Sequence, residues 1–135
     1  MREFRIVVAG HSDLAGALLA TAELICGQLE DVHAVNLLPT DSPESFLDRF
    51  LVAAGDPGRD CLVLTDLVGG TPHNVALAAT RRLPRAVLIS GVNLAVLIEA
   101  AMSTDALDGD SVGRLVAGGR EALVHASGLL ATGSS

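Results

Sequence analysis

The sequence predicts an α/β domain built on an open, mainly parallel sheet with helices on both faces. Four short apolar runs, rich in Val, Ile and Leu, alternate with segments whose apolar residues have helical spacing. Such alternation favours parallel strands joined by right-handed crossover helices. The chain has three Phe and no Trp or Tyr, so the core is aliphatic. We expect the common strand order 2-1-3-4, in which ligands gather outside the carboxyl ends of strands one and three.

The first half of the chain contains two strand–helix units. Residues 4–9 (FRIVVA) predict a buried strand, and residues 14–25 predict a helix that ends before a glycine. Residues 32–38 predict the second strand. The second helix covers residues 43–54, because Ser42 is a favourable N-cap and proline is favoured at the first helical position.

The second half repeats the pattern. Residues 61–65 predict the third strand, and Thr71, as an N-cap followed by proline, opens a helix to about residue 82. Residues 86–90 predict the fourth strand. Two further helices are expected, from residue 94 to about 102 and from residue 111 to about 125.

Length and composition indicate one domain. With 135 residues, 50% of them hydrophobic, the chain can fold without disulfides or a structural metal. We expect residues 1–128 to form this domain and residues 129–135 to form a disordered tail. The apolar runs are far shorter than the roughly 20 residues that span a bilayer, and no signal-peptide pattern opens the chain. The sequence therefore predicts a cytoplasmic protein.

Charge and cysteine content exclude several classes of function. The net charge is −7, all nine basic residues are Arg, and no basic stripe is visible, so we expect no nucleic-acid binding. The two cysteines, Cys26 and Cys61, lie inside apolar runs and are interpreted as small buried hydrophobic residues. We expect no metal site and no cofactor.

His11 and Asp66 are the candidate catalytic residues. His11 follows the first strand and Asp66 follows the third, so both lie at the expected switch point. A carboxylate that accepts a hydrogen bond from one imidazole nitrogen leaves the other nitrogen as a neutral nucleophile. Taken singly, an ordinary loop histidine and a turn-forming aspartate are the alternatives.

Gly69, Gly70 and Thr71 are the candidate phosphate-binding residues. Glycines let backbone N–H groups approach a ligand closely, and the N-terminus of the following helix favours an anion. The Thr71 hydroxyl could donate to a phosphate oxygen, or it could simply cap the helix. A nucleophilic histidine, an orienting carboxylate and an anion-binding helix together indicate a phosphohistidine site.

Rival α/β functions lack their required residues. A receiver domain needs a Lys near the last strand, and a P-loop needs G-x-x-x-x-G-K-[ST], but the chain contains no Lys. A flavin carrier needs a Ser/Thr-rich loop and aromatic residues, and a serine hydrolase needs G-x-S-x-G. Of the other histidines, His33 is expected on the surface or in packing and His125 at a helix end. His73, near the site, could contact a ligand or partner.

Several motifs resemble the enzyme IIA domains of the mannose family of the phosphoenolpyruvate-dependent sugar phosphotransferase system. The strand that ends in Gly10-His11 is similar to their phosphorylated strand, and residues 65–72 (TDLVGGTP) are similar to their second motif. Residues 90–94 (SGVNL) and 119–121 (GRE) are similar to later motifs. His73 stands where the family carries Phe. The resemblance spans about residues 4–124.

The resemblance implies a phosphotransferase with a phosphohistidine intermediate. The phosphocarrier HPr would phosphorylate His11, and His11 would pass the group to an enzyme IIB partner that serves membrane sugar permease components. Asp66 would be the residue bonded to the histidine, and Thr71 would lie near the phosphate. Members are usually homodimers, some with an extra strand exchanged between subunits. No linker or IIB domain follows, so we expect IIB on a separate chain.

Two functional classes stay open at this point. The alternative is a regulatory phosphoprotein of the same family whose His11 phosphorylation is read by a partner without sugar transport. A third interpretation, the related phosphodonor of dihydroxyacetone kinase, lacks the Gly69-Gly70-Thr71-Pro72 form found here. The sequence leaves the sugar open.

Overall fold

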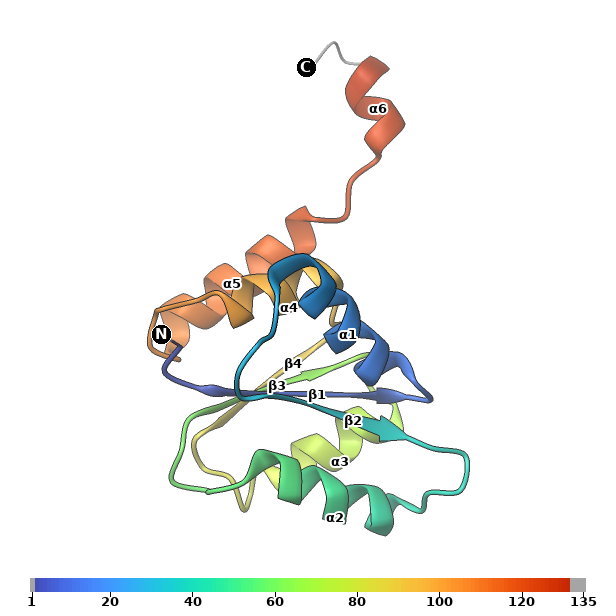
Figure 1. Cartoon of the computed structure of the whole chain (residues 1–135), viewed down its shortest axis with the longest axis vertical. Helices are drawn as coiled ribbons and strands as arrows, with labels where there is room; N and C mark the ends of the chain where they lie inside the picture. The colour runs from blue at the N-terminus through green and yellow to red at the C-terminus, as the bar shows by residue number, and fades with distance from the viewer. Residues whose placement is uncertain (1, 132–135) are drawn as a thin grey trace.

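A four-stranded parallel sheet forms the middle layer of the computed structural model, which describes residues 2–131 (Figure 1). The strands run in the order β2-β1-β3-β4, and all three pairs are parallel. The predicted fold class and strand order are thus confirmed. The strands are β1 (Arg5–His11), β2 (Val32–Leu37), β3 (Cys61–Thr65) and β4 (Ala86–Ser90).

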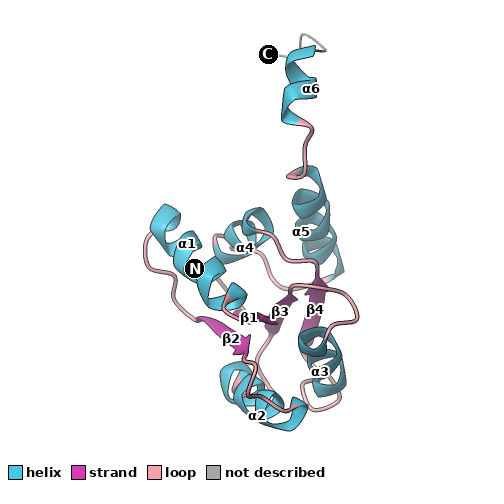
Figure 2. Ribbon diagram, turned by 90° about the vertical axis from the view of Figure 1, so that its right-hand side faces the viewer, coloured by secondary structure: helices cyan, strands magenta, loops and turns pink. Residues whose placement is uncertain are grey.

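Helices cover both faces of the sheet. Figures 1 and 2 show α2 and α3 on one face, α1, α4 and α5 on the other, and α6 projecting away from the sheet. The helices are α1 (Leu14–Cys26), α2 (Pro43–Ala54), α3 (Thr71–Ala79), α4 (Leu94–Ala101), α5 (Gly109–Glu121) and α6 (Ala126–Ala131). None of the helices in the described range has the length and apolarity needed to cross a membrane.

Alternation along the strands divides the core into two layers. Val7 and Val63 point toward α2 and α3 and pack in one cluster with Phe46 and Phe50. The neighbouring residues on each strand belong to the opposite cluster, under α1, α4 and α5. Burial on both faces explains why the strands read as continuous apolar runs. Cys61 is buried as expected, whereas Cys26, at the end of α1, is partly exposed.

Two predicted helix starts need correction. The prediction that Thr71 is an N-cap is wrong, because α3 begins at Thr71 and Gly70 is its N-cap, with a carbonyl that accepts from Asn74 N. Helix α5 begins before the predicted Ser111, because the Asp108 side chain accepts from Ser111 N at 2.9 Å and forms a capping box. At α2, by contrast, Ser42 is the N-cap as predicted.

The C-terminal segment also differs from expectation. Helix α5 ends at Glu121 rather than near His125, and α6 follows after a short connection. Residues 129–131 belong to α6, while residues 132–135 of the expected tail lie outside the described residues. Within residues 2–131 the sheet has four strands, so an exchanged fifth strand and the domain limit at residue 128 stay predictions.

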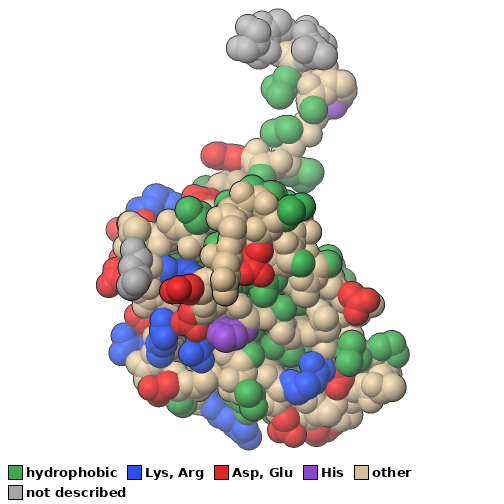
Figure 3. All heavy atoms as spheres, in the orientation of Figure 1, with side chains coloured by type: hydrophobic (Ala, Val, Ile, Leu, Met, Phe, Trp, Pro, Cys, Tyr) green, Lys and Arg blue, Asp and Glu red, His purple; other side chains and the backbone are tan. Residues whose placement is uncertain are grey.

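A charged network closes the end of the sheet opposite the strand carboxyl ends. Asp31 accepts from Arg5 at 2.9 Å and from His33 at 3.0 Å, and it forms an ion pair with Arg59 at 2.7 Å. Burial raises the pKa of Asp31, but hydrogen bonds from His33 and Arg5 outweigh it and hold the pKa below its usual value. Figure 3 shows Arg and acidic side chains interspersed on the face that it draws. His33 therefore has the expected structural role.

Candidate functional site

The sequence-predicted site residues meet at the carboxyl ends of β1 and β3. His11 is the last residue of β1, and Asp66 follows Thr65 at the end of β3. The two strands are neighbours in the sheet. Helix α3 begins five residues after Asp66, so its N-terminus lies at the same edge. This is the switch point that the strand order predicts.

Asp66 binds both the backbone and the ring of His11. Its Oδ2 atom accepts from His11 N at 2.9 Å and lies 2.8 Å from Nδ1. The Asp66 side chain is 10% exposed, whereas the His11 side chain is 46% exposed. An ionised carboxylate only accepts, so Nδ1 carries the proton and Nε2 keeps its lone pair. The expected contact is present, and it leaves Nε2 as the ring nitrogen with a free lone pair.

Asp66 is held in its ionised form. Burial raises the pKa of Asp66, but hydrogen bonds from the His11 backbone and ring outweigh it. The pKa of the carboxyl therefore lies below its usual value. Its other oxygen, Oδ1, is buried and has no hydrogen-bond partner among the described residues. Both hydrogen-bond contacts of Asp66 Oδ2 within the described residues are thus made with His11.

Gly70 lies against the outer edge of the His11 ring. A Cβ atom built on Gly70 would come within 2.7 Å of Cε1 and 3.4 Å of Nε2. Only a glycine leaves this edge free, because a contact under 3.0 Å would displace the ring. Nε2 of His11 is thereby placed beside the first residues of α3.

The N-terminus of α3 has the glycine turn and the helix start on which the predicted anion-binding site rests. Gly69 has φ 83°, which turns the chain into the helix, and Gly70 N donates to Leu67 O at 3.2 Å. The first N–H groups of a helix have no helical acceptor, which leaves those of Thr71 and His73 available. Within residues 2–131 the Thr71 hydroxyl makes no hydrogen bond, so it is not used as a cap. Of the three candidate phosphate-binding residues, Gly70 lies against the His11 ring, and Gly69 and Thr71 are its neighbours in the chain.

His73 has a partner that the sequence did not reveal. Its Nδ1 atom is hydrogen-bonded to Ser90 Oγ, and Ser90 Oγ lies 2.6 Å from Thr65 Oγ1. Only the register of β3 and β4 brings Thr65 and Ser90 side by side. No sequence spacing signals this connection.

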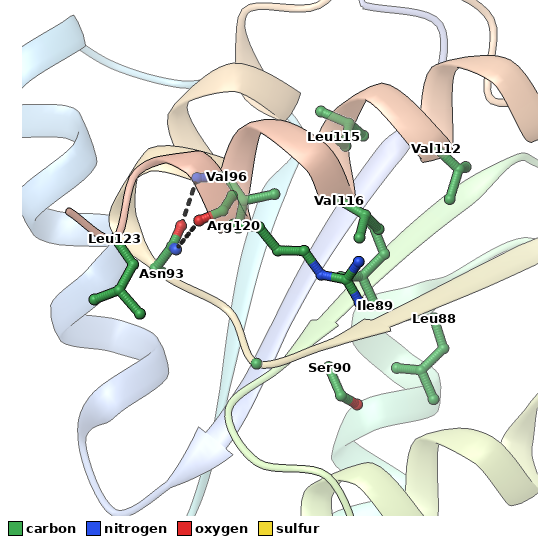
Figure 4. Close-up of a pocket in the computed structure, with 12 residues that line it drawn as sticks. Leu88, Ile89, Ser90, Asn93, Val96, Val112, Leu115, Val116, Arg120 and Leu123 are labelled. Carbon is green, nitrogen blue, oxygen red and sulfur yellow. Dashed lines mark hydrogen bonds between the residues drawn. The ribbon is translucent and has the colours of Figure 1, made fainter.

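A separate hollow lies between β4 and α5 and has a volume of about 630 Å³ (Figure 4). Its lining is mostly aliphatic, with the Arg120 guanidinium running toward Ile89. Asn93, beside it, accepts from Val96 N at 2.9 Å and donates to Gly119 O at 2.8 Å. Asn93, in the SGVNL motif of residues 90–94, therefore caps α4 and connects it to α5. Within residues 2–131 this motif makes no hydrogen bond to His11.

Replacement of Gly70 tests the close approach to the ring. We expect Gly70→Ala to fold normally, because φ −74° suits alanine, but to slow phosphoryl acceptance by about tenfold through displacement of the ring. Single-turnover phosphorylation measures the rate, and urea unfolding checks stability. Gly113→Ala is the control, since a Cβ there meets nothing within 4 Å. A Gly70→Ala rate equal to that of the control would contradict the proposed ring position.

Comparisons with known proteins point to one family. The family model described as PTS system fructose IIA component matches residues 5–117. The sorbose-specific EIIA component of Lacticaseibacillus casei is 30% identical over 113 residues, which cover 82% of this chain and 79% of that protein. The mannose-specific EIIAB component of Escherichia coli K12 is 32% identical over 114 residues. That match covers 83% of this chain but 35% of the longer EIIAB component.

Solved structures give the same answer. The chain is similar to the phosphotransferase system component EIIA from Streptococcus agalactiae, with a TM-score of 0.85 and 30% identity over 92% of this chain and 98% of that chain. It is also similar to the mannose/sorbose-specific IIA subunit from Enterococcus faecalis, with a TM-score of 0.81 and 32% identity. That second match covers 92% of this chain and 94% of the subunit.

The fold and the motifs define a component of the sugar phosphotransferase system, and hence a protein that takes part in phosphoryl transfer during sugar uptake. Within that system, the chain belongs to the mannose/fructose family of enzyme IIA proteins.

Proposed function

We propose that this protein accepts a phosphoryl group from phosphorylated HPr on His11 Nε2 and passes it to an enzyme IIB partner. One observation supports this above all others. The bond between Asp66 Oδ2 and His11 Nδ1, at 2.8 Å, commits one ring nitrogen and leaves Nε2 exposed beside the N-terminus of α3. A phosphocarrier needs a nucleophile that is both activated and accessible to two partners in turn.

The chemical step uses the lone pair on Nε2. This pair attacks phosphorus, a new N–P bond forms, and the bond from phosphorus to the donor breaks, with its electrons leaving on the donor. The His11 ring gains positive charge as the bond forms, and the ionised Asp66 stabilises that charge across 2.8 Å. Transfer to IIB runs the same step in reverse, with IIB supplying the nucleophile. The Nδ1 proton stays in place throughout.

The loop and helix that surround His11 would hold the phosphoryl oxygens. Helix α3 directs its N-terminal end at this place, where backbone N–H groups and the dipole favour negative charge. The Thr71 hydroxyl, which has no bond within the described residues, is available as a further donor. Gly70 permits the close approach. No metal or cofactor is needed for this step.

The reconstituted pathway tests the proposal. The protein is incubated with phosphoenolpyruvate, enzyme I and HPr, and then with candidate IIB proteins. We expect acid-labile phosphorylation that requires HPr and that a cognate IIB removes. Absence of labelling with active HPr would contradict the proposal that HPr is the phosphoryl donor. Label that none of the candidate IIB proteins removes would contradict onward transfer to these partners. Transfer to IIB would reach sugar through the membrane permease components.

We also propose that the protein is a homodimer. The connection between α5 and α6 exposes Leu123 and Val124, which are 88% and 57% exposed, on a segment that leaves the sheet (Figure 2). Beside it, the aliphatic hollow borders β4, the edge strand. A second copy that covers these surfaces would remove apolar area from water. The segment is a candidate for the exchange that the family resemblance implies.

Sedimentation equilibrium at micromolar concentration tests the dimer. We expect about twice the chain mass of 13.8 kDa. Leu123→Asp should shift the equilibrium toward monomer, because it places a charge in the proposed interface. Leu24→Asp, on the exposed end of α1, is the matched control. A wild-type protein that sediments as a 13.8 kDa monomer would exclude the dimer under these conditions.

A further inference from the structure

Three polar side chains from different elements are joined beneath the site. Thr65 ends β3, Ser90 ends β4, and His73 lies in the first turn of α3. Thr65 Oγ1 lies 2.6 Å from Ser90 Oγ, and Ser90 Oγ is hydrogen-bonded to His73 Nδ1. Thr65 is fully buried, and Ser90 and His73 are partly buried. The three residues form a continuous chain from the sheet to the helix.

The donors and acceptors of the three side chains favour one direction of hydrogen bonding along this chain. Each hydroxyl has one proton, and Thr65 Oγ1 has no side-chain partner besides Ser90 among residues 2–131. If Nδ1 of His73 accepts from Ser90, then Ser90 accepts from Thr65, and every hydroxyl proton has an acceptor. If Nδ1 donates instead, Ser90 Oγ can still accept from Thr65 through its second lone pair, but the Ser90 proton then has no acceptor among the described residues. The first arrangement is therefore favoured, and it places the His73 ring proton on Nε2.

This chain connects the two halves of the site. Thr65 directly precedes Asp66, which holds His11, and His73 belongs to the same turn of α3 as Thr71. The His73–Ser90 bond is the only side-chain hydrogen bond, within residues 2–131, from that first turn to the sheet. In the loop before α3, Leu67 and Val68 are 61% and 70% exposed, so their side chains contribute little packing to its position. The first turn of α3 is therefore held against the sheet by the buried Pro72 and by the His73–Ser90 hydrogen bond.

We infer that His73 is a positioning residue which, through Ser90 and Thr65, fixes the first turn of α3 over the nucleophilic nitrogen of His11. This inference rests on the proposed function. His73 touches neither His11 nor the phosphoryl group in this account. It acts by holding Gly70 and Thr71 in place, so its loss should slow transfer while leaving the partner-binding surface intact.

A double-mutant cycle tests the inference. We expect His73→Ala and Ser90→Ala each to slow single-turnover phosphorylation of His11 by about three- to thirtyfold, with the apparent affinity for phosphorylated HPr changed less than twofold. Because both variants break the same link, the double variant should be no slower than the slower single variant. His73→Asn should restore much of the rate, since its amide oxygen can accept from Ser90 in place of Nδ1. His33→Ala is the control.

Three outcomes would overturn the inference: additive effects in the cycle, a His73→Ala rate within twofold of wild type, or a His73→Asn variant as slow as His73→Ala. NMR of the ¹⁵N-labelled ring gives a second readout, in which His73 should carry its proton on Nε2; a proton on Nδ1 alone would contradict the chain. If His73→Ala fails to fold, Ser90→Ala and His73→Asn still decide the matter. Failure of wild-type His11 to accept phosphoryl groups, by contrast, would overturn the proposed function itself.

Discussion

His11→Ala should abolish phosphorylation by HPr, with a loss of at least about 1,000-fold in the rate of label incorporation. His11 supplies the atom that forms the bond to phosphorus, and no neighbouring group replaces it. Asp66 is an acceptor committed to His11, and His73 is bonded to Ser90. Label from phosphoenolpyruvate, followed with enzyme I and HPr present, measures the rate.

The other histidines provide the controls for this variant. His33 is bonded to Asp31 at the opposite end of the sheet, so His33→Ala should be labelled like wild type. The fold of His11→Ala should survive, because the side chain is 46% exposed. Its circular dichroism spectrum should therefore match that of wild type. Persistent labelling of a folded His11→Ala variant would show that the phosphoryl acceptor lies elsewhere.

Asp66→Asn should reduce the rate of phosphoryl transfer by about 10- to 1,000-fold. The reference is a Ser-His-Asp triad, where the comparable change costs about 10⁴. The smaller loss expected here follows from the second bond that Asp66 accepts, from His11 N at 2.9 Å. Two donors facing the same atom favour the amide oxygen in that place, so the productive tautomer is retained while the negative charge is lost.

Asp66→Asn removes the negative charge of the carboxylate and also changes the buried Oδ1 atom. The amide nitrogen would replace Oδ1, which is buried and has no partner among the described residues, so stability should fall by about 1–3 kcal/mol. Single-turnover transfer at saturating phosphorylated HPr isolates the effect on rate, and urea unfolding measures the loss of stability. If folded Asp66→Asn transfers within twofold of wild type, the carboxylate charge does not assist the reaction.

Most of the architecture could be predicted from local sequence patterns. Continuous apolar strands between helical segments predicted the parallel sheet, and the position of His11 after the first strand and Asp66 after the third predicted their contact. The physics involved is local or topological: side-chain periodicity, glycine and proline punctuation, and the meeting of strand ends at one edge. These features hold without knowledge of any individual contact.

The features that sequence reasoning missed depend on atomic placement. Thr71 looks like an N-cap, but the extended backbone of Gly70 takes that position and frees the threonine hydroxyl. Asp108 caps α5, whose first residue, Gly109, is a residue type typical of loops. The chain from Thr65 through Ser90 to His73 requires the register of two strands and the rotation of a helix. None of these can be read from spacing alone.

The central claim is that Nε2 of His11 carries the phosphoryl group, and the most direct test is to locate that group on the ring. Protein labelled with ¹⁵N at histidine is phosphorylated through enzyme I and HPr and kept at alkaline pH for NMR. We expect coupling between ³¹P and Nε2 of His11, with Nδ1 still protonated toward Asp66. Coupling to Nδ1 of His11, or to a nitrogen of any other histidine, would contradict it.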